Sequence, residues 1–259
     1  MSDAPSSSVV PHIIRQAAAS PTFSPLYRQI KTLLMNALGA GEWEPGALIP
    51  SEAELAARFG VSQGTVRKAI DEMSSENLLV RRQGKGTFVA SHGDPPARYR
   101  FLRLRSDDGL PQQKRSLPLS CGAQTADAAI AAALVIQPGD AVMAVERLLC
   151  FDARPVVFDQ IFLRMEIFGE LTLAMLEQEN HAVSLYRFFE QRFGVHMTRA
   201  EERVRAVAAD AGVARRLEVA PDTPLLLVER RAYAYVEHPV EWRRGFYVTD
   251  CHHYYNELG

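Results

Sequence analysis

The stretch VSQGTVRKAIDEMSSENLLVRRQGKGTFV, residues 61–89, decides the fold of the first part of this chain. Its first half carries apolar residues at helical spacing, so one face of a helix must pack against other helices. Its second half predicts two strands, 78–82 and 87–90, joined by a turn in which Gly84 and Gly86 permit a tight reversal. We therefore expect a helix that is followed directly by a short hairpin.

Two further helices are expected before this stretch. The pair Ser24-Pro25 predicts the start of an amphipathic helix that runs to residue 38. The sequence Ser51-Glu52-Ala53-Glu54 is a capping box that opens a second helix. Only residues 60–62 connect it to the third helix, a length at which two helices meet at a steep angle. The third helix should therefore project from the other two.

The polar face of the third helix and the hairpin suggest a nucleic-acid surface. An α-helix fits the major groove of B-form DNA, where residues near its N-terminus reach base edges. Gln63 is therefore placed to bind adenine, Arg67 to bind guanine or a phosphate, and Thr65 to contact phosphate. The hairpin would add a phosphate track of Arg81, Arg82 and Lys85. Residues 58–89 hold six basic and three acidic residues, whereas the whole chain has a net charge of −2.

A simpler interpretation competes with this one. Arg67 and Lys68 could merely solvate a helix face, and charge could merely protect the edge of the hairpin from aggregation. The combination of a helix-turn-helix with a Gly-Lys-Gly tip at this spacing favours DNA binding.

Four motifs of this region resemble the GntR family of bacterial repressors across residues 24–91: Tyr27-Arg28-Gln29-Ile30, Pro50-Ser51-Glu52 with Glu54-Leu55, Val61-Ser62 with Thr65-Val66-Arg67, and Gly84-Lys85-Gly86-Thr87-Phe88-Val89. The resemblance implies a winged helix-turn-helix that binds a pseudo-palindromic operator as a dimer. The DNA contacts expected from the motifs and the outward basic residues are Ser51, Gln63, Thr65, Arg67, Lys68, Arg81, Lys85, Gly86 and Thr87. Ala53 and Gln63-Gly64 depart from the family's common residues, arginine and Arg-Thr, and these departures concern the preferred operator sequence.

Composition and length indicate two domains inside the cell. The 259 residues are 47% apolar, enough for two cores. We expect a disordered tail over 1–23, a DNA-binding domain over 24–91, a linker over 92–97 and a second domain over 98–259. No segment has the pattern of a signal peptide or the length of a membrane span. The three scattered cysteines fit a reducing cytoplasm.

The second domain mixes helical and strand patterns. The helices are expected at 127–135, 167–179 and 184–193, and the strands at 142–151, 155–163, 201–207, 225–235 and 240–254. Arginines alternate with apolar residues over 98–105, which favours a half-exposed strand over extra phosphate contacts. These patterns predict an α+β domain on an antiparallel sheet. They include no nucleotide-binding loop and no catalytic motif, so we expect no cofactor.

Charged residues interrupt the apolar strands of this domain. Arg147, Asp159 and Glu241 each need a partner or water, because the burial of an unpaired charge is costly. Period-two alternation places Glu241 and Tyr247 on one face of a strand and Arg244 on the other. Such groups could hold a small polar ligand or form an ion-pair ladder on the sheet, and the residues alone leave both interpretations open.

The run Cys251-His252-His253 raises the question of a metal site. Adjacent residues of a strand point to opposite faces, so these three side chains should not chelate one ion together. We therefore expect a structural role for them and no metal.

Several features of the second domain resemble the UTRA effector domain of HutC-type GntR regulators, over about residues 97–258. They are Val145-Glu146-Arg147-Leu148, the turn from Asp152 to Pro155, Ser184-Leu185-Tyr186, and Glu241-x-x-Arg244-x-x-Tyr247. The resemblance implies a chorismate-lyase-like fold and a metabolite pocket lined by Arg147, Asp159, Ser184, Tyr186, Glu241 and Tyr247. Leu149 replaces a common second arginine, and the 99–105 segment lacks the Ser/Thr pair of phosphosugar-binding members. A small carboxylate or another modest polar metabolite is therefore expected rather than a sugar phosphate.

These observations together predict a homodimeric, ligand-responsive regulator of transcription, most simply a repressor. Two other functions remain as alternatives. The second domain could be a lyase-type enzyme, although it offers no acid–base pair at motif spacing. The chain could also be a constitutive DNA binder whose second domain only dimerises.

Overall fold

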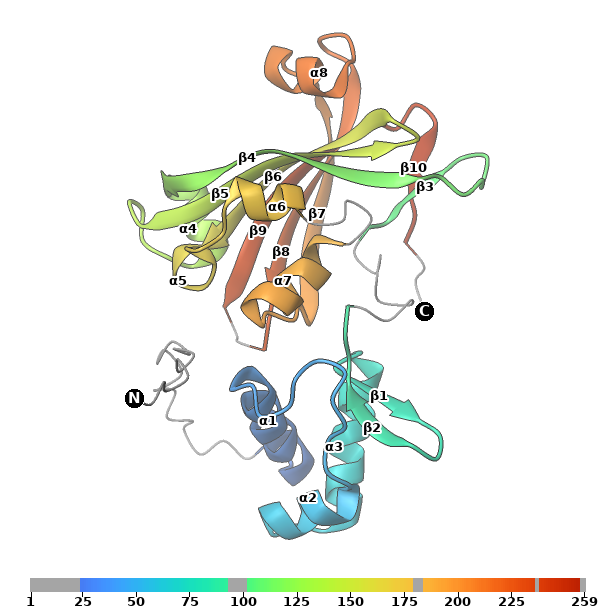
Figure 1. The fold of residues 1–259 in the computed structure, drawn as a ribbon, viewed down its shortest axis with the longest axis vertical. Coiled ribbons are helices and arrows are strands. Elements are labelled where there is room, and N and C mark those ends of the chain that lie inside the picture. Colours follow the sequence, from blue (N-terminus) through green and yellow to red (C-terminus); the bar gives the residue numbers. More distant parts are fainter. Residues whose placement is uncertain (1–23, 93–101, 179–183, 236–237, 257–259) are drawn as a thin grey trace, which may run out of the picture.

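The computed structural model describes residues 24–92, 102–178, 184–235 and 238–256. The first part is a three-helix unit with a two-stranded hairpin, drawn in blue to green in Figure 1. Its elements are α1 (Leu26–Gly39), α2 (Glu52–Phe59), α3 (Gln63–Ser75), β1 (Leu79–Arg82) and β2 (Gly86–Val89). The expected tail over 1–23 and most of the expected linker over 92–97 lie outside the described residues.

The helix ends follow the capping residues of the sequence, with one exception. Ser51 and Glu54 form both bonds of the capping box at the start of α2, and Ser62 accepts a bond from the Thr65 N–H at the start of α3. The expected Ser24 cap is wrong, because α1 begins at Leu26 with Pro25 as a cap that has no side-chain bond. The capping residues Ser51 and Ser62 thus predict the first residues of α2 and α3 to within one residue.

The core of this unit comes from the apolar faces of all three helices and from both strands. Val66, Ala69, Ile70 and Met73 of α3 are fully buried. They pack against α1, α2 and the hairpin through Ile30, Leu34, Leu38, Ile49, Leu55, Ala56, Leu78, Leu79 and Val89. Because this face of α3 is committed to the core, its opposite face is left to solvent.

The second part is an α+β unit on one antiparallel sheet, as expected. The sheet has the strand order β4-β5-β6-β9-β8-β7. Its strands are β4 (Lys114–Thr125), β5 (Ala141–Phe151), β6 (Arg154–Arg164), β7 (Arg199–Ala208), β8 (Pro224–Tyr233) and β9 (Pro239–Tyr247), and its helices are α4 (Ala128–Leu134), α5 (Met165–Phe168), α6 (Leu173–Gln178), α7 (Leu185–Phe193) and α8 (Ala211–Leu217). A separate two-stranded ladder pairs β3 (Leu104–Ser106) with β10 (His252–Tyr254).

The two faces of the sheet are covered by different elements. Helices α5, α6 and α7 pack on one face, which we call the α7 face, where they form the largest apolar cluster with Val145, Ile161 and Val240 (Figure 1). The β3–β10 ladder covers another part of the same face through Leu104. Helices α4 and α8 cover the opposite face in two smaller clusters.

Two elements of this domain were missed, and two expectations were wrong. The strand β4 was not expected, because Pro118 and Gly122 break the alternation of this exposed edge, and its register shifts between Pro118 and Ser120. The short helix α8 was also not expected. The single helix over 167–179 is wrong, since α5 and α6 are separate. The last hairpin ends at Tyr247, and β10 leaves it to pair with β3.

Two sequence features of the second domain are only partly open to comparison. The strand expected over 98–105 is described from residue 102 onward, where β3 begins at Leu104, and residues 98–101 lie outside the described residues. No helix in the described part of the chain is long and apolar enough to span a membrane.

Candidate DNA-binding surface and effector site

An open concavity lies between the hairpin tip and the N-terminal ends of α2 and α3. It has a volume of about 770 Å³. Five of the nine residues expected to contact DNA line it: Ser51, Gln63, Lys85, Gly86 and Thr87. The hairpin tip therefore stands beside the start of the third helix, which is the arrangement that a wing and a recognition helix require.

Two arginines on this surface, Arg67 and Arg81, are held by acidic neighbours. Arg67 donates from Nε to Glu52 Oε2 at 2.8 Å, and Arg81 donates from Nη2 to Glu52 Oε1 at 2.9 Å. Arg81 also pairs with Asp71 at 2.8 Å. Both arginines remain largely exposed, with 57% and 43% of their side chains accessible. A DNA phosphate can therefore reach them, but it must compete with Glu52.

Three other expected contacts have local partners as well. The Ser51 hydroxyl bonds Glu54 Oε2 at 2.7 Å, and the Thr65 hydroxyl lies 2.9 Å from the Ser62 hydroxyl. Lys68 lies over the ring of Tyr27 at 4.1 Å, so its ammonium faces α1. Their roles in DNA contact stay predictions.

The conformation of the wing tip depends on one glycine. Gly86 has φ +105°, in a region that residues with a Cβ rarely adopt. A Cβ at this position would lie 2.7 Å from Leu48 Cδ1. Leu48 itself forms an isolated bridge with Phe88 of β2. Gly86 thus allows the wing to lie close to the segment that leads into α2.

Most of the expected effector residues meet on the α7 face of the sheet. Arg147, Asp159 and Gly245 are direct cross-strand partners on β5, β6 and β9. Glu241 and Tyr247 lie on the same side of β9 as Gly245, as the alternation predicted. Arg244 lies on the opposite face, where it lines a different concavity.

These side chains form a buried network of charges. Asp159 Oδ2 accepts from Arg147 Nε at 2.9 Å and from Arg243 Nη1 at 3.3 Å. Arg243 also donates to both oxygens of Glu241, at 2.9 and 3.1 Å. Arg230 donates from Nε to Glu202 at 2.6 Å. Three arginines thus meet three carboxylates, so burial leaves no net charge.

Two tyrosines complete the network. The Tyr186 hydroxyl of α7 donates to Glu241 Oε1 at 2.9 Å. Burial, together with the negative charge of Glu241, raises the pKa of Tyr186 to about 12. Burial also raises the pKa of Tyr247 to about 12. Both groups are therefore neutral hydrogen-bonding hydroxyls near neutral pH.

One acceptor in the network has no partner among the described residues. Asp159 is 1% exposed, and its Oδ1 makes no hydrogen bond with them. A Cβ at Gly245 would lie 2.9 Å from this oxygen and 2.5 Å from Tyr247 Cε1. Gly245 therefore makes room for Asp159 and the Tyr247 ring. A buried acceptor without a partner is costly, so this oxygen can bind a donor from a ligand.

The residues that form the network are not all those of the expected site. Ser184 caps α7 and accepts from the Arg187 N–H at 3.3 Å, and its role in binding a ligand stays a prediction. Arg243 was not among the expected residues, although its parity on β9 matches that of Glu241 and Tyr247 and could have identified it. Arg230 and Glu202 were missed because they join the network through the register of β7 and β8 with β9.

Helix α7 connects this network to the end of the DNA-binding unit. Glu190 lies one turn after Tyr186, on the same side of the helix. Its carboxylate accepts from the Ser91 hydroxyl at 2.5 Å and from the backbone N–H of His92 at 2.9 Å. The His92 ring lies 5.7 Å from the ring of Tyr186. The segment that leaves the wing is therefore fastened to the effector domain.

A second contact joins the two parts. Tyr235, beyond the end of β8, packs against the core of the helical unit. Its Cβ would lie 3.3 Å from a Cβ placed on Gly39 at the end of α1. Tyr235 therefore lies against the end of α1, and the lower ends of β8 and β9 lie above this helix in Figure 1.

The argument against joint chelation by Cys251, His252 and His253 needs one correction. His252 is buried and His253 is exposed, so these two do point apart. Cys251 precedes β10, however, so strand alternation does not apply to it. Its sulfur lies 3.3 Å from His252 Nδ1.

Comparison with protein families agrees with this architecture. The model of bacterial regulatory proteins of the gntR family matches residues 26–89, and the UTRA domain model matches residues 112–253. The fold and site thus define a DNA-binding regulator of transcription with an effector domain. The chain belongs to the GntR regulators that carry a UTRA domain, which confirms the resemblance seen in its sequence.

Individual relatives support the same assignment. The mannosyl-D-glycerate transport/metabolism system repressor MngR of Escherichia coli is 27% identical over 230 residues, which cover 87% of this chain and 92% of the relative. A histidine utilization repressor of Pseudomonas aeruginosa is 26% identical over 212 residues and 82% of each chain. These relatives are regulators, so the alternative of a lyase-type enzyme is not supported.

A solved structure matches the second domain. It is the ligand-binding domain of a candidate GntR-family transcriptional regulator from Bordetella bronchiseptica. This domain is 42% identical, superposes with a TM-score of 0.60, and covers 62% of this chain and 99% of its own. The α+β fold of the second domain is therefore shared with a ligand-binding domain.

Proposed function

We propose that this protein is a homodimeric repressor that binds a pseudo-palindromic operator and is released from it by a small metabolite. The observation that supports DNA binding by the residues named above is the single concavity that Ser51, Gln63 and the wing tip line together. Gln63 at the start of α3 contacts a base edge in the major groove, and Lys85 at the wing tip contacts phosphate. The protein acts in the cytoplasm, because its DNA partner is there.

The proposed effector is a small carboxylate that also carries a hydroxyl or ammonium donor. Arg147 and Arg243 can exchange a protein carboxylate for that of the ligand, and the unpartnered Asp159 Oδ1 accepts from the donor. The two metabolites in the names of the relatives above, mannosyl-D-glycerate and histidine, both combine these groups. This likeness supports the chemical class and not a particular compound.

Release from DNA follows from the connection through α7. A ligand that draws Arg243 away from Glu241 alters the carboxylate to which Tyr186 donates. Tyr186 lies one turn from Glu190, whose carboxylate holds Ser91 and His92. The relative position of the two DNA-binding units in a dimer then shifts, so that both cannot dock on half-sites about one helical turn apart. Effector and operator must therefore weaken each other reciprocally.

Fluorescence anisotropy with labelled DNA tests the DNA-binding part. We expect a GntR-type palindrome to bind far more tightly than random DNA of equal length, with an affinity that falls steeply as salt rises. Light scattering should show a dimer. Equal and salt-insensitive affinities for both DNAs would refute the proposal.

A thermal-shift panel tests the effector class. Hydroxy acids and amino acids are compared with their amides, and a ligand that binds the folded protein raises the melting temperature by an amount that grows with its concentration relative to Kd. The proposal predicts hits only among the acids, and these hits should also lower operator affinity. If the amides raised the melting temperature as much as the acids do, the proposal of a carboxylate effector would be refuted. A ligand that raises the melting temperature but leaves operator affinity unchanged would instead favour a constitutive DNA binder.

A further inference from the structure

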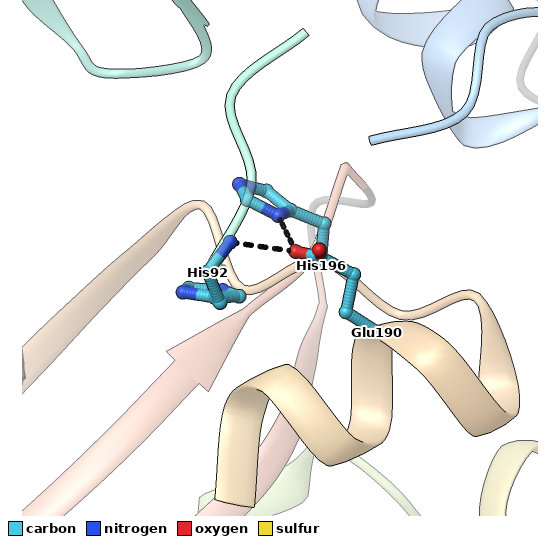
Figure 2. Close-up of side chains that lie close together, drawn as sticks. All are labelled: His92, Glu190 and His196. Atoms are coloured by element: carbon cyan, nitrogen blue, oxygen red, sulfur yellow. Dashed lines mark hydrogen bonds and ion pairs between the residues drawn. The ribbon is translucent and has the colours of Figure 1, made fainter. Parts of the chain in front are cut away.

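A second group of polar side chains is buried where the two parts of the chain meet. It consists of His92, at the end of the segment that leaves the wing, Glu190 on α7, and His196 just beyond that helix (Figure 2). Their exposed fractions are 2%, 9% and 2%. One ligand atom of each residue lies within 4.8 Å of the others. Neither the DNA surface nor the effector network uses this cluster.

The donor set suits a divalent transition metal. Two imidazoles and one carboxylate match the three protein ligands of open zinc sites, whereas magnesium and calcium prefer oxygen ligands. The carboxylate is also oriented from outside the cluster, because the Ser91 hydroxyl donates to Glu190 Oε1 at 2.5 Å. Partners of this kind fix the position of a ligating group.

Hydrogen bonds hold the same atoms together without a metal. His196 Nδ1 lies 2.6 Å from Glu190 Oε2, and the Met197 N–H donates to His92 Nε2 at 3.1 Å. Two ligands of a tetrahedral ion with bonds of about 2.0–2.2 Å are roughly 3.3 Å apart. Only a small separation of His196 and Glu190 is therefore needed. The ion replaces the proton on Nδ1, which moves to Nε2 of a neutral imidazole or to solvent from an imidazolium.

Coordination by His92 has a defined structural consequence. If Nε2 binds the ion, its lone pair is no longer available to the Met197 N–H. If Nδ1 binds the ion, Nε2 carries the ring proton and cannot accept. In either case the bond between His92 and Met197 is lost, so metal binding changes how the segment after the wing attaches to the effector domain.

A nearby hydroxyl favours a bound species at this position. Tyr235 stacks on His196, with ring centroids 5.8 Å apart. Its hydroxyl is buried and has no hydrogen-bond partner among the described residues. A tyrosine hydroxyl is a hydrogen-bond donor. It can serve a water in the open coordination position of the ion.

We propose that His92, Glu190 and His196 form a binding site for one divalent transition-metal ion of the zinc class at the junction of the two domains. The ion links three segments, the end of the wing, α7 and the loop that follows it. Its binding stabilises one attachment of the DNA-binding unit, at the same carboxylate through which the proposed effector signal passes.

Cobalt and zinc binding to the full-length, metal-stripped protein test the proposal. We expect one equivalent of Co²⁺ per chain, with the visible absorption of a tetrahedral nitrogen–oxygen site, and its displacement by one equivalent of Zn²⁺. His92→Asn, Glu190→Gln and His196→Asn should each lower the affinity for zinc, measured against a chromogenic chelator, by at least tenfold. Ser91→Ala should lower it by about 10- to 100-fold, as loss of an orienting partner does.

The matched control addresses the other candidate cluster, Asp250, Cys251 and His252, which is partly exposed and whose Asp250 already pairs with Arg154. Cys251→Ser should leave the stoichiometry and the affinity unchanged. Thermal melting of each variant in chelator shows whether it is folded, and a folded His196→Asn variant with unchanged zinc affinity would overturn the proposal. So would the absence of saturable binding by the natural protein, or loss of binding in Cys251→Ser alone.

Discussion

Tyr186 and Glu190 lie one turn apart on α7, and each holds a different part of the molecule. Tyr186 donates to Glu241 in the buried charge network, whereas Glu190 accepts from Ser91 and His92 at the end of the wing. A single helical face thus borders both the proposed effector site and the attachment of the DNA-binding unit. We therefore expect a change in the network to reach the wing through this helix, without any rearrangement of the sheet.

The division of labour between the two sites can be tested with two variants. Arg67→Ala should weaken operator binding by about 1–3 kcal/mol, because it removes a direct contact from α3. Glu241→Gln should leave operator affinity unchanged and abolish release by the effector. Anisotropy titrations with and without effector measure both. Loss of operator binding by a folded Glu241→Gln variant would contradict this separation.

Glu52 should act as an intramolecular competitor of DNA. It accepts from both Arg67 and Arg81, and each exposed pair is worth roughly 0.2–1 kcal/mol. Glu52→Gln should therefore tighten DNA binding several-fold at low salt. Asp71→Asn frees only Arg81 from one of its two partners and should have the smaller effect. Weaker binding by Glu52→Gln would show that the carboxylate orients Arg67 instead of competing for it.

Gly86→Ala should distort the wing through its backbone more than through crowding. The φ of +105° costs an alanine about 1–3 kcal/mol, while Leu48, which is 55% exposed, can move its methyl group aside. Operator affinity should fall in Gly86→Ala and stay low when Leu48→Ala is added. Recovery of DNA binding in the double variant would assign the effect to the 2.7 Å contact instead.

Asp159→Asn should destabilise the second domain strongly. The substitution keeps the shape of the side chain but leaves Arg147 and Arg243 with one carboxylate fewer in a buried site. Removal of one partner from such a network costs about 3–5 kcal/mol, which urea unfolding measures. Arg205→Gln, which breaks an exposed pair with Glu229, should cost about 1 kcal/mol or less.

The two network tyrosines should titrate late. Their pKa values of about 12 in the folded state exceed the ordinary value of 10, so their contribution to stability is complete below pH 10 and is lost between pH 10 and about 12. A spectrophotometric titration of phenolate should show tyrosines that ionise near pH 12. Tyr186→Phe and Tyr247→Phe should each lower the number of these tyrosines by one. Loss of a group that titrates near pH 10, instead of a late group, in a folded Tyr186→Phe variant would place the Tyr186 hydroxyl in water.

Local signals made the helical unit predictable. Ser51, Ser62 and the glycines of the wing each determine a helix start or a turn through bonds to near neighbours, so α2, α3 and the hairpin follow from the sequence to within a residue or two. The strand β4 was missed, because Pro118 and Gly122 disrupt its pattern and its pairing with β5 is a tertiary effect.

The effector network was predictable only along single strands. Alternation placed Glu241 and Tyr247 on one face of β9, and the same rule would have added Arg243. Arg230 and Glu202 enter from β8 and β7, and only the register between strands brings them there. The cluster of His92, Glu190 and His196 joins positions about a hundred residues apart, and its members follow no motif in the sequence.

The proximity of Tyr235 to Gly39 has a consequence for exchanging domains between regulators. Any hybrid that takes residues 24–92 from another member of the family must place its own residue 39 against this tyrosine, and a side chain there would start 3.3 Å from Tyr235 Cβ. Transplanted operator specificity should therefore succeed when the donor has a glycine at the end of its first helix. A bulky residue at that position would push Tyr235 away from α1, so the effector would no longer control the DNA-binding unit of the hybrid.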